Sequence, residues 1–190
     1  MTTPHWILGS GSPRRKELLA GIGVNFEIRT KDTDEVYPEH LAPQEVPLYL
    51  AALKAAALLD ELAENEVVIC ADTVVILDNG IMGKPADRED AIRMLSRLAG
   101  RTHEVVTGVF MGNSERQISQ ADSTLVTFGE LTREEIEQYI EQHKPFDKAG
   151  SYGVQEWMGY VAVEKLVGSY TNVMGLPTHV VYRMLKEFRH

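Results

Sequence analysis

One nearly continuous apolar run, residues 67–77 (VVICADTVVIL), constrains the fold of this chain most strongly. Such a run, rich in β-branched residues, is typical of a strand buried on both faces at the centre of a sheet. Asp72 interrupts it. Because an ionised carboxylate in a dry core is costly unless it is paired or metal-bound, we expect Asp72 to face a cleft or a cation. It has the chemistry of a general base or a magnesium ligand. The alternative is a structural carboxylate paired with a lysine.

Helical and strand patterns alternate along the rest of the chain. We expect strands at residues 5–8, 103–111, 124–128 and 160–166, with residues 81–82 pairing back after the turn at 78–80. Helices are expected at residues 13–21 and 47–63, and after Asp87, Thr132 and Pro177. Residues 27–42 and 150–159 read as irregular. The alternation predicts one α/β domain over residues 1–190, with a mixed sheet flanked by helices.

The charge and composition narrow the class of protein. The chain has 190 residues and a formal net charge of −9, which disfavours non-specific nucleic-acid binding. Its single cysteine, Cys70, allows no internal disulfide and fits a reducing compartment. No signal-peptide pattern is present, and no apolar run approaches the roughly 20 residues of a membrane-spanning helix. We therefore expect a cytoplasmic protein with no nucleic-acid or membrane partner.

The segment 9–15 (GSGSPRR) places small residues between a predicted strand and a helix N-terminus. Free backbone N–H groups and the helix dipole favour an anion there. Arg14 and Arg15 lie in the first helical turn, where a cation is disfavoured by about 0.3–1 kcal/mol. Because arginine grips phosphate oxygens with two N–H groups, the segment indicates a phosphate site. The alternative is a solvated helix start with two surface arginines.

Four further side chains are weaker candidates. Lys54 lies in an alanine- and leucine-rich helix, Lys84 follows the predicted hairpin, and Glu35 lies in an acidic cluster. Taken singly, each is typical of a surface charge. Gln155 ends the glycine-rich segment 150–155 and could both donate to and accept from a base edge. The histidines show no spacing typical of a zinc site.

Five segments together resemble the Maf family of nucleotide pyrophosphatases. They are residues 9–19 (GSGSPRRKELL), 71–73 (ADT), 83–85 (GKP), 147–155 (DKAGSYGVQ) and 172–177 (NVMGLP). They occur in family order, and the resemblance covers about residues 6–188. It implies a Maf/ITPase-like α/β fold with two lobes around a central cleft, often in a homodimer. It also implies pyrophosphate release from a nucleoside triphosphate with a divalent cation, Mg or Mn.

The same resemblance assigns roles to individual residues. The proton acceptor falls on Asp72, which with Glu35 is also an expected metal ligand. The phosphate contacts fall on Ser10, Arg14, Arg15, Lys54 and Lys84. The branch that acts on dTTP and UTP matches better than the 7-methyl-GTP branch, through Arg14, Thr73 and Gln155. Glu156-Trp157 departs from the glycine and small or polar residue of many relatives, and adds bulk beside the expected base pocket.

Two other functions remain open from the sequence. One is a house-cleaning pyrophosphatase that removes modified nucleotides. The other is a nucleotide-binding regulator of cell division with little catalysis of its own. Pyrophosphate release from a panel of nucleotides separates all three.

Overall fold

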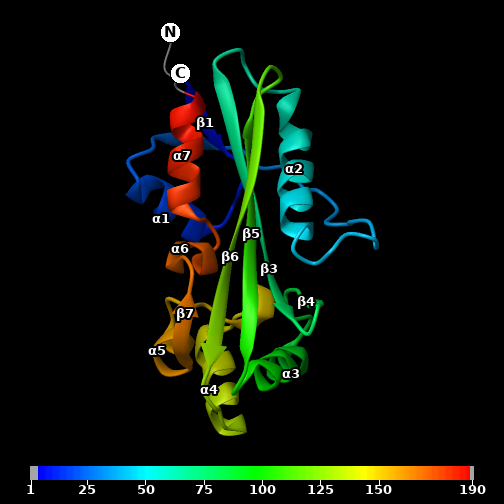
Figure 1. Ribbon diagram of the computed structural model, residues 1–190, viewed down its shortest axis with the longest axis vertical. Helices are drawn as coiled ribbons and strands as arrows, with labels where there is room; N and C mark the ends of the chain where they lie inside the picture. Colours follow the sequence, from blue (N-terminus) through cyan, green and yellow to red (C-terminus); the bar gives the residue numbers. More distant parts are fainter. Residues whose placement is uncertain (1–3, 189–190) are drawn as a thin grey trace. The chain divides into compact units, whose positions relative to one another are not determined.

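The computed structural model describes residues 4–188 of the chain. These residues fold into a mixed sheet flanked by helices (Figure 1). The seven strands within these residues are β1 (His5–Leu8), β2 (Phe26–Ile28), β3 (Glu66–Leu77), β4 (Gly80–Met82), β5 (Thr102–Gly112), β6 (Gln117–Phe128) and β7 (Val163–Val167). The strand order is β2-β1-β3-β5-β6-β7, and β4 pairs with β3. The helices are α1 (Pro13–Gly21), α2 (Val46–Leu59), α3 (Arg88–Leu98), α4 (Arg133–His143), η1 (Ala149–Ser151), α5 (Trp157–Val161), α6 (Tyr170–Met174) and α7 (Thr178–Phe188). The α/β class and the mixed sheet are confirmed.

Strand β3 is the apolar run, and it lies inside the sheet as expected. It pairs in parallel with β1, with Ile7 opposite Val68, and antiparallel with β4, with Ile76 opposite Ile81. The turn between β3 and β4 has Asp78 and Asn79 at φ of 52° and 59°. Two successive left-handed residues suit a tight hairpin turn, so the predicted hairpin is confirmed.

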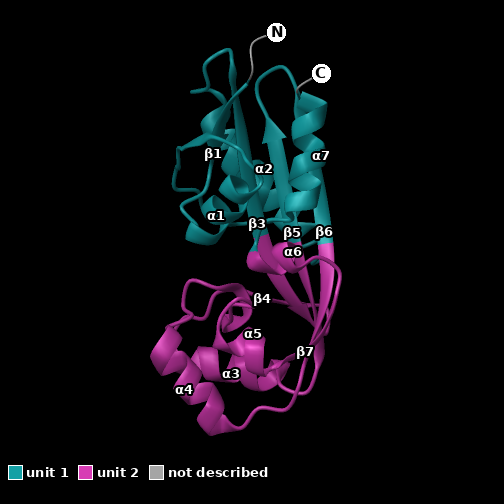
Figure 2. Ribbon diagram, turned by 90° about the vertical axis from the view of Figure 1, so that its left-hand side faces the viewer, with its two compact units in different colours: residues 1–72, 107–122, 175–190 teal, residues 73–106, 123–174 magenta. Residues whose placement is uncertain are grey.

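The chain divides into two compact units, each with a hydrophobic core of its own (Figure 2). Unit 1 comprises residues 1–72, 107–122 and 175–190. In it, alternate β3 residues serve opposite faces: Val67 and Ile69 pack in the cluster that contains α7 residues, whereas Val68 and Cys70 pack with α2. This two-fold alternation is the geometry of an extended strand.

Unit 2 comprises residues 73–106 and 123–174. Its core combines the end of β3 with α3, α4 and the loop that follows α4. The predicted caps are present: the Asp87 side chain accepts from Asp90 N–H at 2.8 Å, and Thr132 and Glu135 form a reciprocal capping box. These caps fix where α3 and α4 begin.

A buried histidine lies in the unit 2 core. His103 is 2% exposed, and its Nε2 lies 2.7 Å from the Tyr152 hydroxyl. Burial lowers the pKa of His103 from 6.5 to about 4. At a pH between these two pKa values, the histidine is protonated in the unfolded chain but neutral in the folded protein. The free energy of unfolding therefore falls as the pH falls through this range.

We expect the free energy of unfolding to drop by about 2 kcal/mol from this group between about pH 7.5 and about pH 4.5. Urea unfolding of the wild-type protein and of His103→Gln over that range measures the effect. Glutamine keeps a polar group beside Tyr152 but does not titrate, so its pH dependence should be shallower by that amount. Parallel curves for the two proteins would contradict the buried, neutral histidine.

Several element boundaries differ from the sequence predictions. A short strand, β2, lies at the start of the segment predicted to be irregular, and β6 begins at Gln117 instead of residue 124. Helix α2 ends at Leu59, before the predicted residue 63. Helices α5 and α6 were not predicted, and β7 begins at Val163 because α5 takes up the preceding residues. Among the described residues, none of the helices is long and apolar enough to cross a membrane.

Candidate active site

The Asp72 carboxylate lies at the end of the β3 segment that belongs to unit 1. The alternation along β3 places residue 72 on the face of Val68 and Cys70, which is the face covered by α2. Asp72 is 8% exposed, and its Oδ1 lies 2.5 Å from Lys54 Nζ. The cation next to Asp72 is therefore a lysine of α2, a pairing that fits both the expected cation partner and the alternative of a structural carboxylate paired with a lysine.

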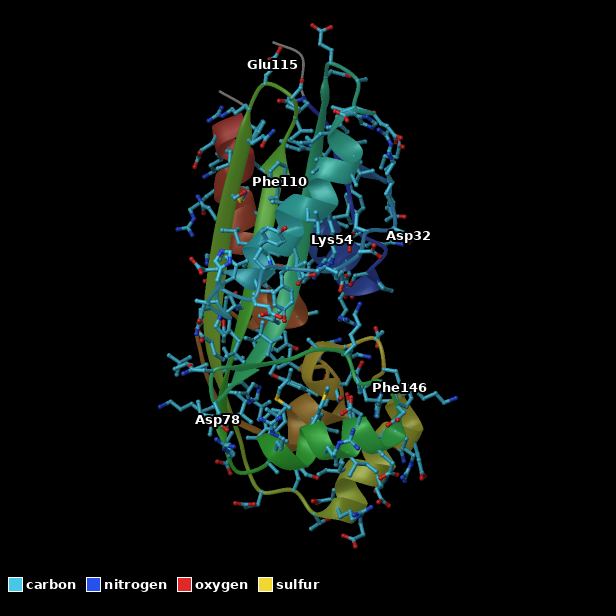
Figure 3. The ribbon with its side chains drawn as sticks, turned by 90° about the vertical axis from the view of Figure 1, so that its right-hand side faces the viewer. Asp32, Lys54, Asp78, Phe110, Glu115 and Phe146 are labelled. Atoms are coloured by element: carbon cyan, nitrogen blue, oxygen red, sulfur yellow. The ribbon has the colours of Figure 1, made fainter. Side chains whose placement is uncertain are left out.

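Lys54 connects two carboxylates. Its ammonium group lies 2.5 Å from Asp72 Oδ1 and 2.8 Å from Glu35 Oε1. Figure 3 labels Lys54 on α2 and Asp32 on the segment that also carries Glu35. The Lys54 side chain is 18% exposed, whereas that of Glu35 is 45% exposed. Lys54 is thus no solvated surface charge, and Glu35 reaches the site from a solvent-exposed segment.

Arg15 is anchored by the loop and by the far end of the chain. Its Nε donates to the Gly175 carbonyl at 2.8 Å, and its Nη1 donates to Ser10 Oγ at 3.3 Å. Ser12 caps α1 as predicted, with its Oγ 3.5 Å from Arg15 N. These contacts hold a guanidinium group beside the small-residue loop, the arrangement that suits a phosphate.

Gly9 permits the close packing of this loop. A Cβ at this position would overlap Cys70 Sγ and lie 3.0 Å from Leu58 Cδ1. Gly9 N–H donates to the Ile69 carbonyl at 2.8 Å, which extends the β1–β3 pairing. The glycine therefore lets the loop leave β1 directly beside the strand that carries Asp72.

Burial and the neighbouring positive charges shift the pKa of the Asp72 carboxyl in opposite directions. Burial raises the pKa of the Asp72 carboxyl, while the Lys54 ammonium and the Arg15 guanidinium lower it. Burial likewise lowers the pKa of Arg15, and Asp72 opposes that change. Arg14 is half-buried and adds positive charge next to Arg15. The neighbouring Cys70 thiol has its pKa raised by burial to about 12, so it is no nucleophile at neutral pH.

Three of the predicted residues belong to unit 2. Thr73 follows Asp72 directly on β3 and is half-buried. Lys84 is exposed, and the carbonyl of the preceding Gly83 accepts from Gly150 N–H at 3.0 Å. This bond brings the segment of Lys84 next to the loop that ends at Gln155. The structure thus groups Ser10, Arg15, Lys54, Asp72 and Glu35 in unit 1, and joins the segments of Lys84 and Gln155 in unit 2.

Two oxygen donors in unit 1 suit a divalent cation. The carboxylates of Asp72 and Glu35 lie near each other, because Asp72 Oδ1 and Glu35 Oε1 both contact Lys54 Nζ. Paired carboxylates are the ligands that Mg²⁺ and Mn²⁺ prefer, so the donor chemistry fits such an ion. Among residues 4–188, the one cluster of three metal-ligating side chains is elsewhere, at His5, Glu27 and Glu66. Both Glu66 oxygens there already accept from Arg29, at 2.8 and 2.9 Å.

Some contacts of the site had no signal in the sequence. The Gly175 carbonyl that orients Arg15 is 160 residues away along the chain. The Lys148, Glu156 and Tyr139 side chains also meet in unit 2, with Lys148 Nζ 3.1 Å from Glu156 Oε1 and Tyr139 OH 2.6 Å from Glu156 Oε2. A lysine that precedes a glycine-rich loop was the available hint for the second group.

Comparison with known proteins gives a family and a set of similar chains. A family model described as "Maf-like protein" matches residues 5–188. The chain is 52% identical over 185 residues to a dTTP/UTP pyrophosphatase of Porphyromonas gingivalis, covering 96% of this chain and 93% of the relative. It is 50% identical to a protein of the same name from Phocaeicola vulgatus, over 95% of this chain and 94% of the relative. A third, from Flavobacterium psychrophilum, is 47% identical over 94% of this chain and 92% of its own length.

Proposed function

The chain belongs to the Maf-like protein family, and we propose that it is a nucleoside triphosphate pyrophosphatase that hydrolyses dTTP and UTP to the monophosphate and pyrophosphate. Relatives with that printed name align over nearly the whole length of this chain at about half identity. The family model spans both the loop of residues 9–15 and the segment that ends at Gln155.

One observation carries this proposal: a buried carboxylate, Asp72, is held next to Lys54 and within the field of Arg15. Although the protein has a formal net charge of −9, two cationic side chains, Lys54 and Arg15, lie close enough to the Asp72 carboxylate to affect its pKa. Cations next to a carboxylate that can accept a proton are what the hydrolysis of an anionic phosphoric anhydride needs.

The proposed reaction is an attack of water on the α-phosphorus. Asp72 accepts a proton from that water, a bond forms between the water oxygen and the α-phosphorus, and the bond to the bridging oxygen of the β-phosphate breaks. Pyrophosphate leaves with the bridging oxygen. Arg15, Arg14 and Ser10 bind phosphate oxygens at the start of α1, and Lys54 offsets negative charge that develops in the transition state.

Asp72 and Glu35 are proposed to hold the divalent cation. Such an ion, Mg²⁺ or Mn²⁺, supplies charge neutralisation on the phosphate oxygens when it is bound. The two carboxylates lie near each other, because both contact the Lys54 ammonium group, and this supports the assignment. Removal of the ion with a chelator should therefore stop pyrophosphate release, and added Mg²⁺ or Mn²⁺ should restore it.

Residues of unit 2 are proposed to bind the rest of the nucleotide. Lys84 contributes a further phosphate contact, while Thr73 and Gln155, with Arg14, select the pyrimidine. The hydrogen bond from Gly150 to Gly83 supports a shared role for the two segments, because it joins them side by side. The homodimer, the central cleft and the cytoplasmic location remain proposals from the family resemblance, the low cysteine content and the acidic charge.

A panel of nucleotides at equal concentration tests the function. With a divalent cation present, we expect the highest kcat/KM for pyrophosphate release with dTTP and UTP, and lower values with CTP and 7-methyl-GTP. A preference for modified bases would assign the chain to house-cleaning instead. Nucleotide binding without pyrophosphate release would indicate a regulator that lacks this chemistry.

A further inference from the structure

The backbone of the loop that carries Gln155 is held in place by contacts N-terminal to that residue. It begins at Lys148, a buried lysine, and passes through Gly150 and Ser151 at φ of 65° and 64°. A non-glycine residue such as Ser151 persists in this left-handed region only where its surroundings hold it. Gly150 N–H donates to the Gly83 carbonyl at 3.0 Å, and a Cβ on Gly150 would lie 3.0 Å from Val75 Cγ2.

The Glu156 carboxylate, directly after Gln155, has a separate partner on each oxygen. Lys148 Nζ lies 3.1 Å from Oε1, and the Tyr139 hydroxyl of α4 donates to Oε2 at 2.6 Å. The same hydroxyl accepts from Gly153 N–H at 3.1 Å. Tyr139 of α4 therefore holds the chain on both sides of Gln155.

There is little room for these groups to move. A Cβ on Gly153 would lie 2.8 Å from the Glu156 carboxyl carbon, so the carboxylate packs directly on the loop backbone. Burial and the neighbouring Glu156 both raise the pKa of Tyr139, which keeps its hydroxyl a donor. Lys148 also pairs with Asp147 at 2.9 Å, but that carboxylate is largely exposed. Of the two carboxylates that pair with Lys148, Glu156 is therefore the less exposed, and it links Lys148 to Tyr139.

We propose that Glu156 is a positioning residue that fixes Gln155 for the pyrimidine base and thereby contributes to selectivity for uracil and thymine over cytosine. This inference rests on the proposed function. Among residues 4–188, Gln155 Oε1 is buried and has no hydrogen-bond partner, so it can accept from a ligand N–H group. Uracil and thymine carry N–H at ring position 3, whereas cytosine has a bare nitrogen there. Tyr139 and Lys148 hold the chain on either side of Gln155, which restricts where the Gln155 amide can lie and thereby favours the base with the matching N–H group.

Glu156→Gln tests the role, because it keeps the size of the side chain but removes the charge that pairs with Lys148. We expect KM for UTP and dTTP to rise about tenfold, kcat to stay within about twofold, and the ratio of kcat/KM for UTP over CTP to fall about tenfold. Glu137→Gln is the matched control: it removes an equally charged group that pairs with Arg133 on the outer part of α4, and it should change none of these values.

Tyr139→Phe provides a second variant if Glu156→Gln does not fold. It should reproduce the rise in KM and the loss of selectivity, and the double variant should lose less than the sum of the two, because both act through one network. Folded variants with wild-type KM and wild-type selectivity would overturn the role of Glu156. So would an equal fall in kcat for every nucleotide. A wild-type protein that releases no pyrophosphate from any nucleotide would overturn the proposed function itself, which the wild-type measurement reveals on its own.

Discussion

Asp72→Asn is expected to lower kcat for pyrophosphate release by about 10²–10⁴-fold while nucleotide affinity changes only a few-fold. Asparagine is nearly isosteric with aspartate but cannot accept the proton of the attacking water. Lys54 keeps Glu35 as an ion-pair partner at 2.8 Å, so the surrounding cations stay in place. Single-turnover kinetics with dTTP and UTP give the chemical step, and equilibrium binding of the same nucleotides to the variant gives the affinity.

Asp60→Asn serves as the control for this prediction. Asp60 is the exposed C-cap residue of α2, so the substitution removes one negative charge from the same unit without touching the site. We expect wild-type kcat and KM from it. Turnover at the wild-type rate by folded Asp72→Asn would remove Asp72 from the mechanism.

Lys54→Met should produce the second large effect, a fall in kcat/KM of about 10²–10³-fold together with a shift of its pH dependence. The Lys54 ammonium lowers the pKa of Asp72, which burial raises. Without it, the pKa of Asp72 rises further, and a smaller fraction of the carboxyl is ionised at a given pH. The acidic limb of the kcat/KM profile should therefore move to higher pH, with activity recovering in part as the pH rises.

Lys31→Met is the matched control, because Lys31 pairs with Glu61 in a largely exposed salt bridge of unit 1. Exposed pairs of this kind contribute little, so both the rate and the pH profile should stay those of the wild type. If the acidic limb of Lys54→Met coincided with that of the wild type, Asp72 would not be the group that titrates in the free enzyme.

Local patterns were sufficient to predict the elements that organise unit 1. The apolar run gave β3, and Ser12 and Pro13 marked the start of α1 where the structure has it. Elements that depend on distant partners were missed. Strand β2 alternates apolar and polar residues but is only three residues long, and it forms by pairing with β1, with Phe26 beside Trp6. The first half of β6 has polar residues on both faces, so it lacks the alternation of a half-buried strand.

Helix α5 forms although a glycine lies within it. Gly159 lowers the helix propensity of this segment, which favoured a loop. In the structure the glycine is required, because a Cβ there would overlap the Val154 carbonyl oxygen. Gly159 therefore suits this helix because it packs against the carbonyl of Val154, just before the helix begins, a contact that helix propensity does not describe.

At the candidate site, the sequence indicated that a cation lies near Asp72, but it did not establish which residue provides that cation. The interruption of an apolar strand by Asp72 indicated a nearby positive charge, and Lys54 provides it at 2.5 Å. The orientation of Arg15 could not be predicted, because its acceptor is the backbone carbonyl of Gly175. Every residue has a backbone carbonyl, so the residue type at position 175 does not indicate this hydrogen bond. The roles of Thr73, Lys84 and Gln155 stay predictions from the family resemblance.

Hydrolysis of UTP in ¹⁸O-labelled water tests most directly whether this site activates a water against the α-phosphorus. We expect mass spectrometry to find one ¹⁸O atom in UMP and none in pyrophosphate, in a reaction that Asp72→Asn does not support. Label in pyrophosphate or in free orthophosphate would place the attack at another phosphorus and contradict attack at the α-phosphorus.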